Sequence, residues 1–426
     1  MPNDDSPAAG AGSSATEATR IGPRLWALPV IIFLTAAMTV GQITILGKQV
    51  FDMTGKPLDL GLLGLAEFVP TLLLAPLSGV LSDRYDRRVM YACGLVGEAA
   101  ASLGLYFYVA SDPTSVMPIF ALVFAFGCAR SVLSAASRVM PVDNAPAAAV
   151  ERMVAVCMCG WQAGFAAGPV VFSFVFVADV AAPYLLATAV SLAAAALLTI
   201  LPASGVARST AVAGAGVRAV IVHALQGLRF IRSNRVVLSI ISLDLFAVLF
   251  GGAVALLPAI AEERLGVGAV GLGLLRAAVG IGALLTMAAL AVRPLTRRVG
   301  PTLMAAVGAF GLGTIVLGLT RSFVVAFIAL LLLSGADSVS VFVRSTLVPL
   351  ATPEDMRGRV MAVEYTFVGA SNELGAFESG IAGALLGVAG SVVFGGVGTL
   401  AVVAAWWMLF PELRGIDQFA EVRPDT

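Results

Sequence analysis

Apolar runs long enough to cross a membrane recur along this chain and restrict its fold more than any other feature. They follow one another from Trp26 to Phe410, and an α-helix of about 20 apolar residues spans the roughly 30 Å hydrocarbon core of a bilayer. The composition agrees, because 59% of the residues are hydrophobic and 12% are charged, against about 45–50% and about 25% in soluble domains. A soluble domain could not bury so much apolar surface, so we expect an all-α membrane protein.

Charged residues, proline and glycine divide the apolar sequence into twelve predicted transmembrane helices. Their ranges are 25–50, 58–82, 89–110, 115–138, 152–177, 183–201, 236–260, 268–292, 301–320, 322–349, 360–387 and 389–410. The long break at 203–235 ends in a stretch whose apolar and basic residues alternate at helical spacing. This pattern predicts an amphipathic helix along the membrane face.

The arginine distribution predicts the orientation, because short cytoplasmic loops retain Lys and Arg. With the N-terminus inside, nineteen of the 26 basic residues lie in cytoplasmic segments. Four lie outside, namely Lys48, Lys56, Arg264 and Arg321. Both termini are therefore expected in the cytoplasm.

The two halves of the chain resemble each other. The segment 152–156 (RMVAV) recurs as 359–363 (RVMAV), and at the same offset of 207 residues Gly168 falls opposite Gly375. Parallel repeats of six helices are typical of transporters that rock two bundles about a central site. The predicted divisions are a disordered cytoplasmic tail at 1–22, a six-helix bundle at 23–202, a linker at 203–235, a second bundle at 236–411 and a cytoplasmic tail at 412–426.

A charged loop follows the second predicted helix. It reads GVLSDRYDRR from Gly79 to Arg88 and resembles the G-x-L-[AS]-D-R-x-G-R-[RK] loop of the major facilitator superfamily, with Asp86 in place of the usual glycine. The resemblance implies the major facilitator fold, with twelve transmembrane helices in two pseudo-symmetric bundles. It also implies a cytoplasmic gate, in which Asp83 pairs with arginine or caps a helix. The predicted gate residues are Gly79, Asp83, Arg84, Arg87 and Arg88.

Small residues mark the fifth predicted helix. Gly160, Gly164, Gly168 and Pro169 resemble the glycine-proline motif of the superfamily's antiporting exporters, although the trailing glycine pair is absent. Glycines at this spacing form a flat face that another helix can approach closely. Ordinary helix packing is the alternative interpretation.

Three later segments look like the branch of bacterial enterobactin exporters and Tap-like drug efflux pumps. They are 243–252, 273–276 and 357–380. The resemblance implies a multi-pass protein of the bacterial cytoplasmic membrane.

Ionisable side chains inside predicted helices form the third group of candidates, because charge at membrane depth is costly and usually functional. The candidates for proton coupling or substrate binding are Glu67, Arg130, Asp244, Arg276, Asp337, Arg344, Glu364, Glu373 and Glu378. Asp244 and Asp337 are the favoured proton carriers, with static ion pairs as the alternative. Arg130 is where exporters of the superfamily often have a buried arginine tied to proton transfer. Glu378 is expected in a gate, and Glu98, on a peripheral helix, in a structural role.

These features predict a proton-coupled antiporter that exports a siderophore-like small molecule from the cytoplasm to the periplasm. Broad-specificity drug efflux is the alternative, and a non-transporting scaffold or receptor is a further one. We expect a monomer in the lipid bilayer that has a small-molecule substrate and no nucleic-acid partner. The chain has no G-x-x-x-x-G-K-[ST] motif for ATP, so the proton gradient is the expected driving force. No cofactor, metal site or catalytic residue is expected, and no enzyme activity.

Overall fold

The protein is built from helices joined by short turns. The computed structural model describes residues 22–137, 139–201 and 217–422, in which no strand occurs. The first half contains η1 (Pro23–Trp26), α2 (Ala27–Thr54), α3 (Pro57–Arg84), α4 (Arg87–Val109), α5 (Met117–Ser137), α6 (Met140–Asn144), η2 (Ala147–Ala149), α7 (Val150–Ala178) and α8 (Ala182–Leu198). The second half contains α9 (Val217–Ser233), α10 (Arg235–Phe250), η3 (Gly252–Leu256), α11 (Leu257–Ala259), η4 (Ile260–Leu265), α12 (Gly268–Val292), α13 (Val299–Leu319), α14 (Phe323–Leu350), α15 (Glu354–Leu409), α16 (Pro411–Gly415) and η5 (Phe419–Val422).

Twelve membrane-crossing segments can be identified among the described residues. Ten helices are long and apolar enough to cross a bilayer, and Ala182–Leu198 is a shorter apolar helix. The long helix α15 contains two segments, because Gly387 inside it has non-helical angles of φ 74° and ψ 163°. A positive φ of this kind favours glycine, and the bend lies at the predicted boundary between the last two spans.

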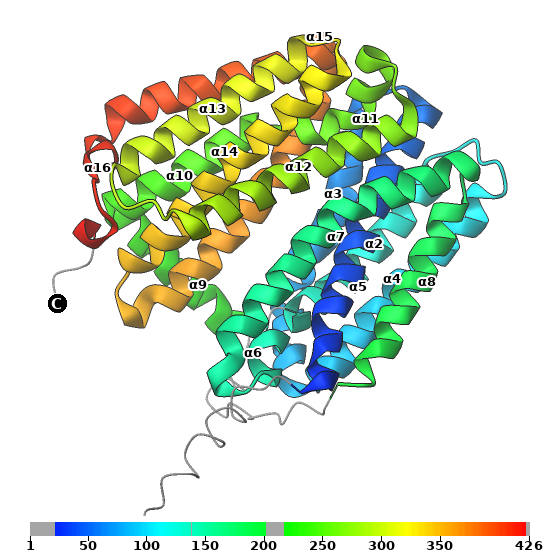
Figure 1. The fold of residues 1–426 in the computed structure, drawn as a ribbon, viewed down its shortest axis with the longest axis horizontal. Helices are drawn as coiled ribbons and strands as arrows, with labels where there is room; N and C mark the ends of the chain where they lie inside the picture. Colours follow the sequence, from blue (N-terminus) through cyan, green and yellow to red (C-terminus); the bar gives the residue numbers. More distant parts are fainter. Residues whose placement is uncertain (1–21, 138, 202–216, 423–426) are drawn as a thin grey trace, which may run out of the picture.

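The helices form two bundles (Figure 1). In the first bundle α2 packs against α7, and α4 packs against α5 and α8. In the second bundle α12 packs against α14, and α13 and α10 pack against α15. The bundles meet where α7 lies beside α12 and α3 lies beside α15. The predicted all-α fold with two six-helix bundles is confirmed.

Equivalent glycines show the pseudo-symmetry of the bundles. A Cβ atom at Gly168 on α7 would lie 2.1 Å from the Ala37 carbonyl oxygen on α2. A Cβ atom at Gly375 on α15 would lie 2.6 Å from the Val248 carbonyl oxygen on α10. The repeat seen in the sequence therefore corresponds to the same helix-on-helix contact in each bundle.

The span predicted at 236–260 is found as the apolar segment Arg235–Leu265, but it is not one regular α-helix. Helix α10 ends at Phe250, and the segment continues as the short elements η3, α11 and the π-helix η4. The break occurs where the chain presses against α15, since a Cβ atom at Gly252 would lie 2.2 Å from the Gly375 carbonyl oxygen. Two consecutive glycines lower the helix propensity there.

The linker and the C-terminal residues pack against the second bundle. Helix α9 contacts α15, where a Cβ atom at Gly227 would lie 2.7 Å from the Arg359 carbonyl oxygen. Beyond α16, the backbone N–H groups of Val299 and Gly300 donate to the carbonyl oxygens of Asp417 and Ile416 at 3.2 and 3.0 Å. The described part of the predicted 412–426 tail therefore caps the start of α13. Residues 1–21 of the predicted N-terminal tail lie outside the described part of the chain.

Candidate functional site

A buried arginine in the second bundle holds carboxylates from two other helices. Arg344 on α14 forms ion pairs through Nη1 with Asp244 Oδ2 on α10, and through Nε with Glu364 Oε1 on α15 at 3.1 Å. The three side chains are only 7–8% exposed. Salt bridges at such depth need good geometry to offset the lost hydration of both partners, and here one guanidinium serves two carboxylates.

A third carboxylate belongs to the same cluster. Asp337 lies seven residues before Arg344 on α14, two turns along the same helix face, and is within electrostatic range of Arg344 and Asp244. We call Asp244, Asp337, Arg344 and Glu364 the C-bundle cluster. It has three acids and one base, so its formal charge is negative unless carboxyl groups carry protons.

A second cluster lies between the bundles. Arg130 Nη1 on α5 pairs with Glu67 Oε1 on α3 at 3.0 Å. From the other bundle, Glu373 on α15 is within electrostatic range of this pair and of Arg276 on α12. We call Glu67, Arg130, Arg276 and Glu373 the interface cluster.

Two members of the interface cluster bear directly on its possible ligands. The Glu373 carboxylate reaches α3, because a Cβ atom at Gly64 would lie 2.8 Å from Glu373 Oε2. Arg276 forms no ion pair with the described residues, and its buried Nε has no hydrogen-bond partner there. Arg276 therefore differs from Arg130 and Arg344, whose charges are already matched by carboxylates.

Glu378, which was expected in a gate, and Glu98, which was expected in a structural role, lie outside these clusters. Glu378 is half-buried, and its Oε2 accepts a hydrogen bond of 3.4 Å from the adjacent Ser379 hydroxyl. No arginine of the described part of the chain forms an ion pair with it. Glu98 on α4 is fully buried at 0% exposure, and neither carboxylate oxygen has a hydrogen-bond partner among the described residues. The position of Glu98 on a peripheral helix did not predict this complete burial, because the side chain faces inward only through the rotation of α4 about its axis.

The predicted gate loop is bound to its own bundle. The Asp86 carboxylate caps α4 by accepting from the Arg88 N–H at 2.9 Å, and Arg88 Nη1 donates to the Leu201 carbonyl oxygen at 2.6 Å. Arg87 pairs with Asp143 on α6. The surroundings of Gly79 and the side chains of Asp83 and Arg84 lie outside what the structure describes, so the predicted gating roles of these residues stay predictions.

The Asp86 carboxyl at the head of α4 has a shifted pKa. Partial burial pushes this pKa up, but hydrogen bonds from the Arg88 guanidinium and N–H, together with the charge of Arg88, outweigh burial. The pKa of Asp86 is therefore below its usual value of 3.8. The residue that departs from the superfamily's glycine thus acts as a charged helix cap.

The glycine face of α7 lies against α2. Cβ atoms at Gly160 and Gly164 would lie 2.8 and 2.4 Å from the carbonyl oxygens of Pro29 and Phe33. With Gly168, this makes a close contact along two turns of α7. Near Pro169, α7 also meets α12, because a Cβ atom at Gly273 would lie 2.6 Å from the Pro169 carbonyl oxygen.

An ion pair that no sequence motif indicated joins the ends of α2 and η4. Lys48 on α2 pairs with Asp52 one turn on, and with Glu262 of η4 in the other bundle at 3.1 Å. Lys48 is 6% exposed. Beside it, a Cβ atom at Gly47 would lie 3.0 Å from the Pro258 ring, so the two bundles are in contact at this end.

Other close approaches between the bundles lie along α3 and α15 and along α12 and α7. A Cβ atom at Gly380 on α15 would lie 3.1 Å from the Pro57 carbonyl oxygen at the start of α3. This contact lies at the end of the bundles where Lys48 lies, the end that the arginine distribution predicts to be outer. A Cβ atom at Gly280, midway along α12, would lie 3.1 Å from Ala166 Cα on α7.

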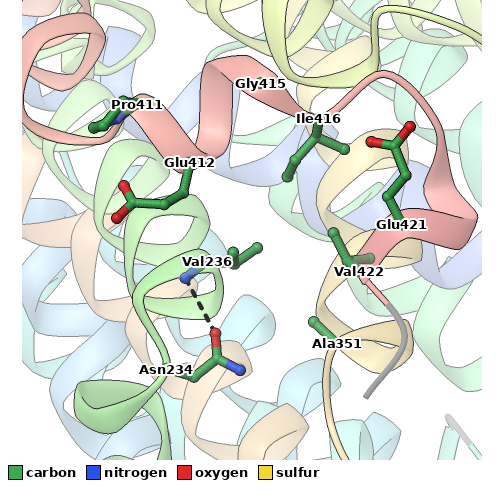
Figure 2. Close-up of a pocket in the computed structure, with 9 residues that line it drawn as sticks. All are labelled: Asn234, Val236, Ala351, Pro411, Glu412, Gly415, Ile416, Glu421 and Val422. Carbon is green, nitrogen blue, oxygen red and sulfur yellow. Dashed lines mark hydrogen bonds between the residues drawn. The ribbon is translucent and has the colours of Figure 1, made fainter. Parts of the chain in front are cut away.

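One cavity on the second bundle lies away from both charged clusters. It measures about 450 Å³ and lies where α10 begins and α14 ends, beside α16 (Figure 2). Asn234, whose Oδ1 accepts from the Val236 N–H at 3.1 Å, forms part of its wall. It touches neither the C-bundle cluster nor the interface cluster, so we do not assign it to the transport site.

Comparison with known families decides the identity of this arrangement. The sequence model described as Major Facilitator Superfamily matches residues 25–376, most of the chain. The chain belongs to the major facilitator superfamily. It is accordingly a multi-pass membrane transporter, as are its structural neighbours in the superfamily, and not an enzyme.

One relative from Bacillus subtilis is distantly similar to this chain. An uncharacterized MFS-type transporter of Bacillus subtilis (strain 168), YfiS, is 23% identical over 133 residues, which is 30% of this chain and 31% of that protein. The match thus spans less than a third of the relative's length.

Solved structures of the superfamily share the fold. The nucleoside transporter NupG has a TM-score of 0.74 at 13% identity, over 91% of this chain and 99% of that chain. The human organic anion transporter MFSD10 has a TM-score of 0.65 at 18% identity, over 91% and 100%. A bacterial homologue of the human lysosomal transporter Spinster, in an inward-facing and occupied conformation, has a TM-score of 0.69 at 13% identity, over 94% and 98%.

Proposed function

We propose that this transporter is a proton-coupled antiporter that exports a small organic molecule by alternating access. The observation that carries the proposal is the C-bundle cluster. In this cluster Arg344 forms ion pairs with Asp244 and Glu364, and Asp337 lies within electrostatic range of Arg344. Uncompensated charge in a membrane interior is costly. A cluster with more acids than bases is stabilised when protons bind to it, and it is therefore suited to exchanging protons.

The arginine offers a mechanism for that exchange. With Arg344 held by Asp244 and Glu364, the third acid, Asp337, has no ion pair among the described residues and is the proposed resting place of the proton. If substrate binding or bundle rocking moves Arg344 toward Asp337, the arginine favours the ionised form there and the proton is released. Asp244 and Glu364, left without their cation, then become the sites that take protons up.

The direction of transport is proposed from the motifs. We propose that both termini lie on the cytoplasmic side of a bacterial cytoplasmic membrane. In that orientation the contacts near Lys48 would close the outer side, and the molecule would face inward. The glycine face from Gly160 to Pro169 and the paired Arg130 agree with the resemblance to antiporting exporters. Within the superfamily we propose the branch that resembles enterobactin exporters and Tap-like pumps, acting as a monomer with the two bundles at 23–202 and 236–411.

The substrate class is proposed from Arg276. Because Arg276 has no ion pair with the described residues at the bundle interface, its guanidinium is available to an anionic group such as a catecholate. A siderophore-like anion is therefore the proposed cargo, with amphipathic drugs as the competing proposal. Glu67 and Glu373 beside it would be the recognition groups for a cationic drug.

Proteoliposomes test the coupling. The purified protein is reconstituted and an imposed pH gradient drives uptake of two probes, a catecholate siderophore and the lipophilic cation ethidium. We expect the gradient to accelerate uptake of one probe in the wild type, and to have no effect in Asp337→Asn. Glu151→Gln, an exposed acid at the start of α7, serves as the matched control.

The outcomes separate the parts of the proposal. Uptake that is equal with and without the pH gradient would refute proton coupling. Gradient-driven uptake of ethidium alone, insensitive to Arg276→Gln, would replace the siderophore proposal by drug efflux. A reporter fused to the C-terminus and found on the outer face would refute the proposed orientation.

A further inference from the structure

Glu98 is a buried acid that the proposed mechanism does not use. It lies on α4 at 0% exposure, and Oε1 and Oε2 both lack hydrogen-bond partners among the described residues. A carboxylate that is ionised, buried and unpaired is among the least favourable groups in a protein. The neutral, protonated acid is the form that such a site tolerates.

The groups around Glu98 include one cation. Arg130 on α5 and Glu67 on α3 are within electrostatic range of the Glu98 carboxyl. On α4 itself Tyr91 is also in range, and its hydroxyl is bonded to Thr35 of α2 at 3.1 Å. Arg130 is therefore the one cation that the described part of the chain brings near Glu98, and it is held by Glu67 at 3.0 Å.

Several uncharged polar groups lie on α4 and on the helices packed against it. Ser102, one turn beyond Glu98, lies 2.7 Å from Gln42 Oε1 on α2, while Gln42 Nε2 is buried without a partner among the described residues. On α8, Thr188 lies 3.3 Å from the Ala99 carbonyl oxygen, and the buried Tyr184 hydroxyl has no partner among the described residues. Among the described residues, the interior of this bundle thus contains polar groups without partners, but Arg130 is the one cation in range of Glu98.

Glu67 stands at the place where the bundles meet. It belongs to the interface cluster, and Glu373 of the other bundle reaches α3 one turn before it, at Gly64. Rocking of one bundle against the other therefore alters the electrostatic surroundings of Glu67. Glu98 lies inside its own bundle, where α4 packs on α5 and α8, and is not altered in this way.

We propose that Glu98 is a second proton-binding site, and that Arg130 passes between Glu67 and Glu98 when the bundles move. With Arg130 on Glu67, the Glu98 carboxyl keeps its proton. When Arg130 moves to Glu98, the Glu98 O–H bond breaks and the carboxylate pairs with the arginine, while Glu67, left without its cation, takes up a proton. The exchange moves one proton from the bundle interior to the interface and leaves the total charge unchanged.

This inference rests on the proposed proton coupling for its role in transport, but its test does not need transport. Infrared spectroscopy of the purified protein in lipid nanodiscs distinguishes the C=O stretch of a protonated carboxylic acid from the bands of carboxylates, at neutral pH and with deuterium exchange. We expect Glu98→Gln to lose the intensity of one protonated carboxyl. We expect Glu67→Gln to lose the same component, because the freed Arg130 then pairs with Glu98.

Two further variants make the assignment specific. Arg130→Met removes the shared cation, so the protonated-acid band should gain the intensity of about one carboxyl as Glu67 also binds a proton. Glu151→Gln, with an exposed acid, should leave the band unchanged. If Glu98→Gln does not fold, Glu67→Gln and Arg130→Met still decide the question.

The results that overturn the inference are distinct from those that overturn the proposed function. A protonated-acid band unchanged in Glu98→Gln shows that Glu98 holds no proton, and a band unchanged in Glu67→Gln shows that Arg130 is not shared. If both bands change as expected while proteoliposome uptake ignores the pH gradient, the proton site stands and the proposed antiport falls.

Discussion

Replacing Arg344 by methionine tests the electrostatics of the C-bundle cluster most directly. Arg344 is 8% exposed and is the partner of Asp244 and Glu364. Removing one partner of a buried ion pair costs about 3–5 kcal/mol, because the other charge stays buried and unpaired. At roughly 2–4 °C per kcal/mol, the scaling for domains of 150–250 residues, the loss corresponds to about 6–20 °C in Tm.

The pH dependence of this loss distinguishes charge from packing. At low pH the stranded carboxyl groups bind protons and become neutral, so the destabilisation should be smaller at about pH 5 than at about pH 8. The assay is thermal unfolding of the purified protein at both pH values. The triple variant Arg344→Met, Asp244→Asn and Glu364→Gln should recover much of the lost stability, since it removes the stranded charges.

A control and a refuting result complete this test. Arg297→Met removes an exposed arginine outside the cluster and should change Tm by much less. If Arg344→Met unfolds at the same temperature as Arg297→Met at both pH values, Arg344 is not a buried counter-ion and the proposed role of the cluster is wrong.

Three further predictions concern the Lys48–Glu262 ion pair, the Asp86 helix cap and the glycine face of α7. Lys48→Gln removes the ion pair to Glu262, whose side chain is 49% exposed. The loss of about 0.5–1 kcal/mol should shift the equilibrium two- to fivefold toward molecules in which the bundles are separated at this end. Unchanged distances between spin labels on the Lys48 ends of the two bundles would contradict this prediction. Asp86→Ala should lower stability by about 0.5–2 kcal/mol through loss of the α4 cap. Asp86→Asn removes only the charge. Because the folded-state pKa of Asp86 is below 3.8, the wild type should be more stable than Asp86→Asn above about pH 4, and this difference should disappear as the pH falls through the folded-state pKa. A difference in Tm between the two proteins that persists in acid would argue against this prediction. Gly168→Ala should lower the free energy of unfolding by about 1–3 kcal/mol, because the added Cβ atom pushes α7 away from α2. Gly358→Ala is the control, since a Cβ atom at Gly358 meets nothing within 4 Å. Equal Tm values for the two alanine variants would refute the packing argument.

Much of the fold could be predicted because membranes impose one-dimensional rules on a sequence. A spanning helix satisfies its own backbone hydrogen bonds and must be apolar along its length. Composition and run length therefore located the helices, and the repeat of Arg152–Val156 as Arg359–Val363 placed them in two halves. The close contacts of Gly168 and Gly375 were also predictable in kind, since glycine at helical spacing has few other uses in a membrane helix.

The exception to this success lies in one segment. The stretch after Phe250 is as apolar as its neighbours, yet it is broken into η3, α11 and η4. Hydropathy reports whether a segment can stay in the membrane, not whether a packed neighbour permits a regular helix there. Gly251 and Gly252 were signals of the break, but only the position of Gly375 on α15 shows why it occurs.

By itself, the sequence determined that this protein is a two-fold repeated helical membrane protein with ionisable groups at membrane depth. Only the tertiary structure decided which of those groups meet: Arg344 with Glu364, Lys48 with Glu262, and Glu98 with no partner among the described residues. The physical reason is rotation. Successive residues of an α-helix point about 100° apart, so a small uncertainty in the rotation of a helix decides whether a side chain faces lipid, a partner helix or the bundle interior. Local sequence leaves that rotation open, and the packing of the neighbouring helices sets it.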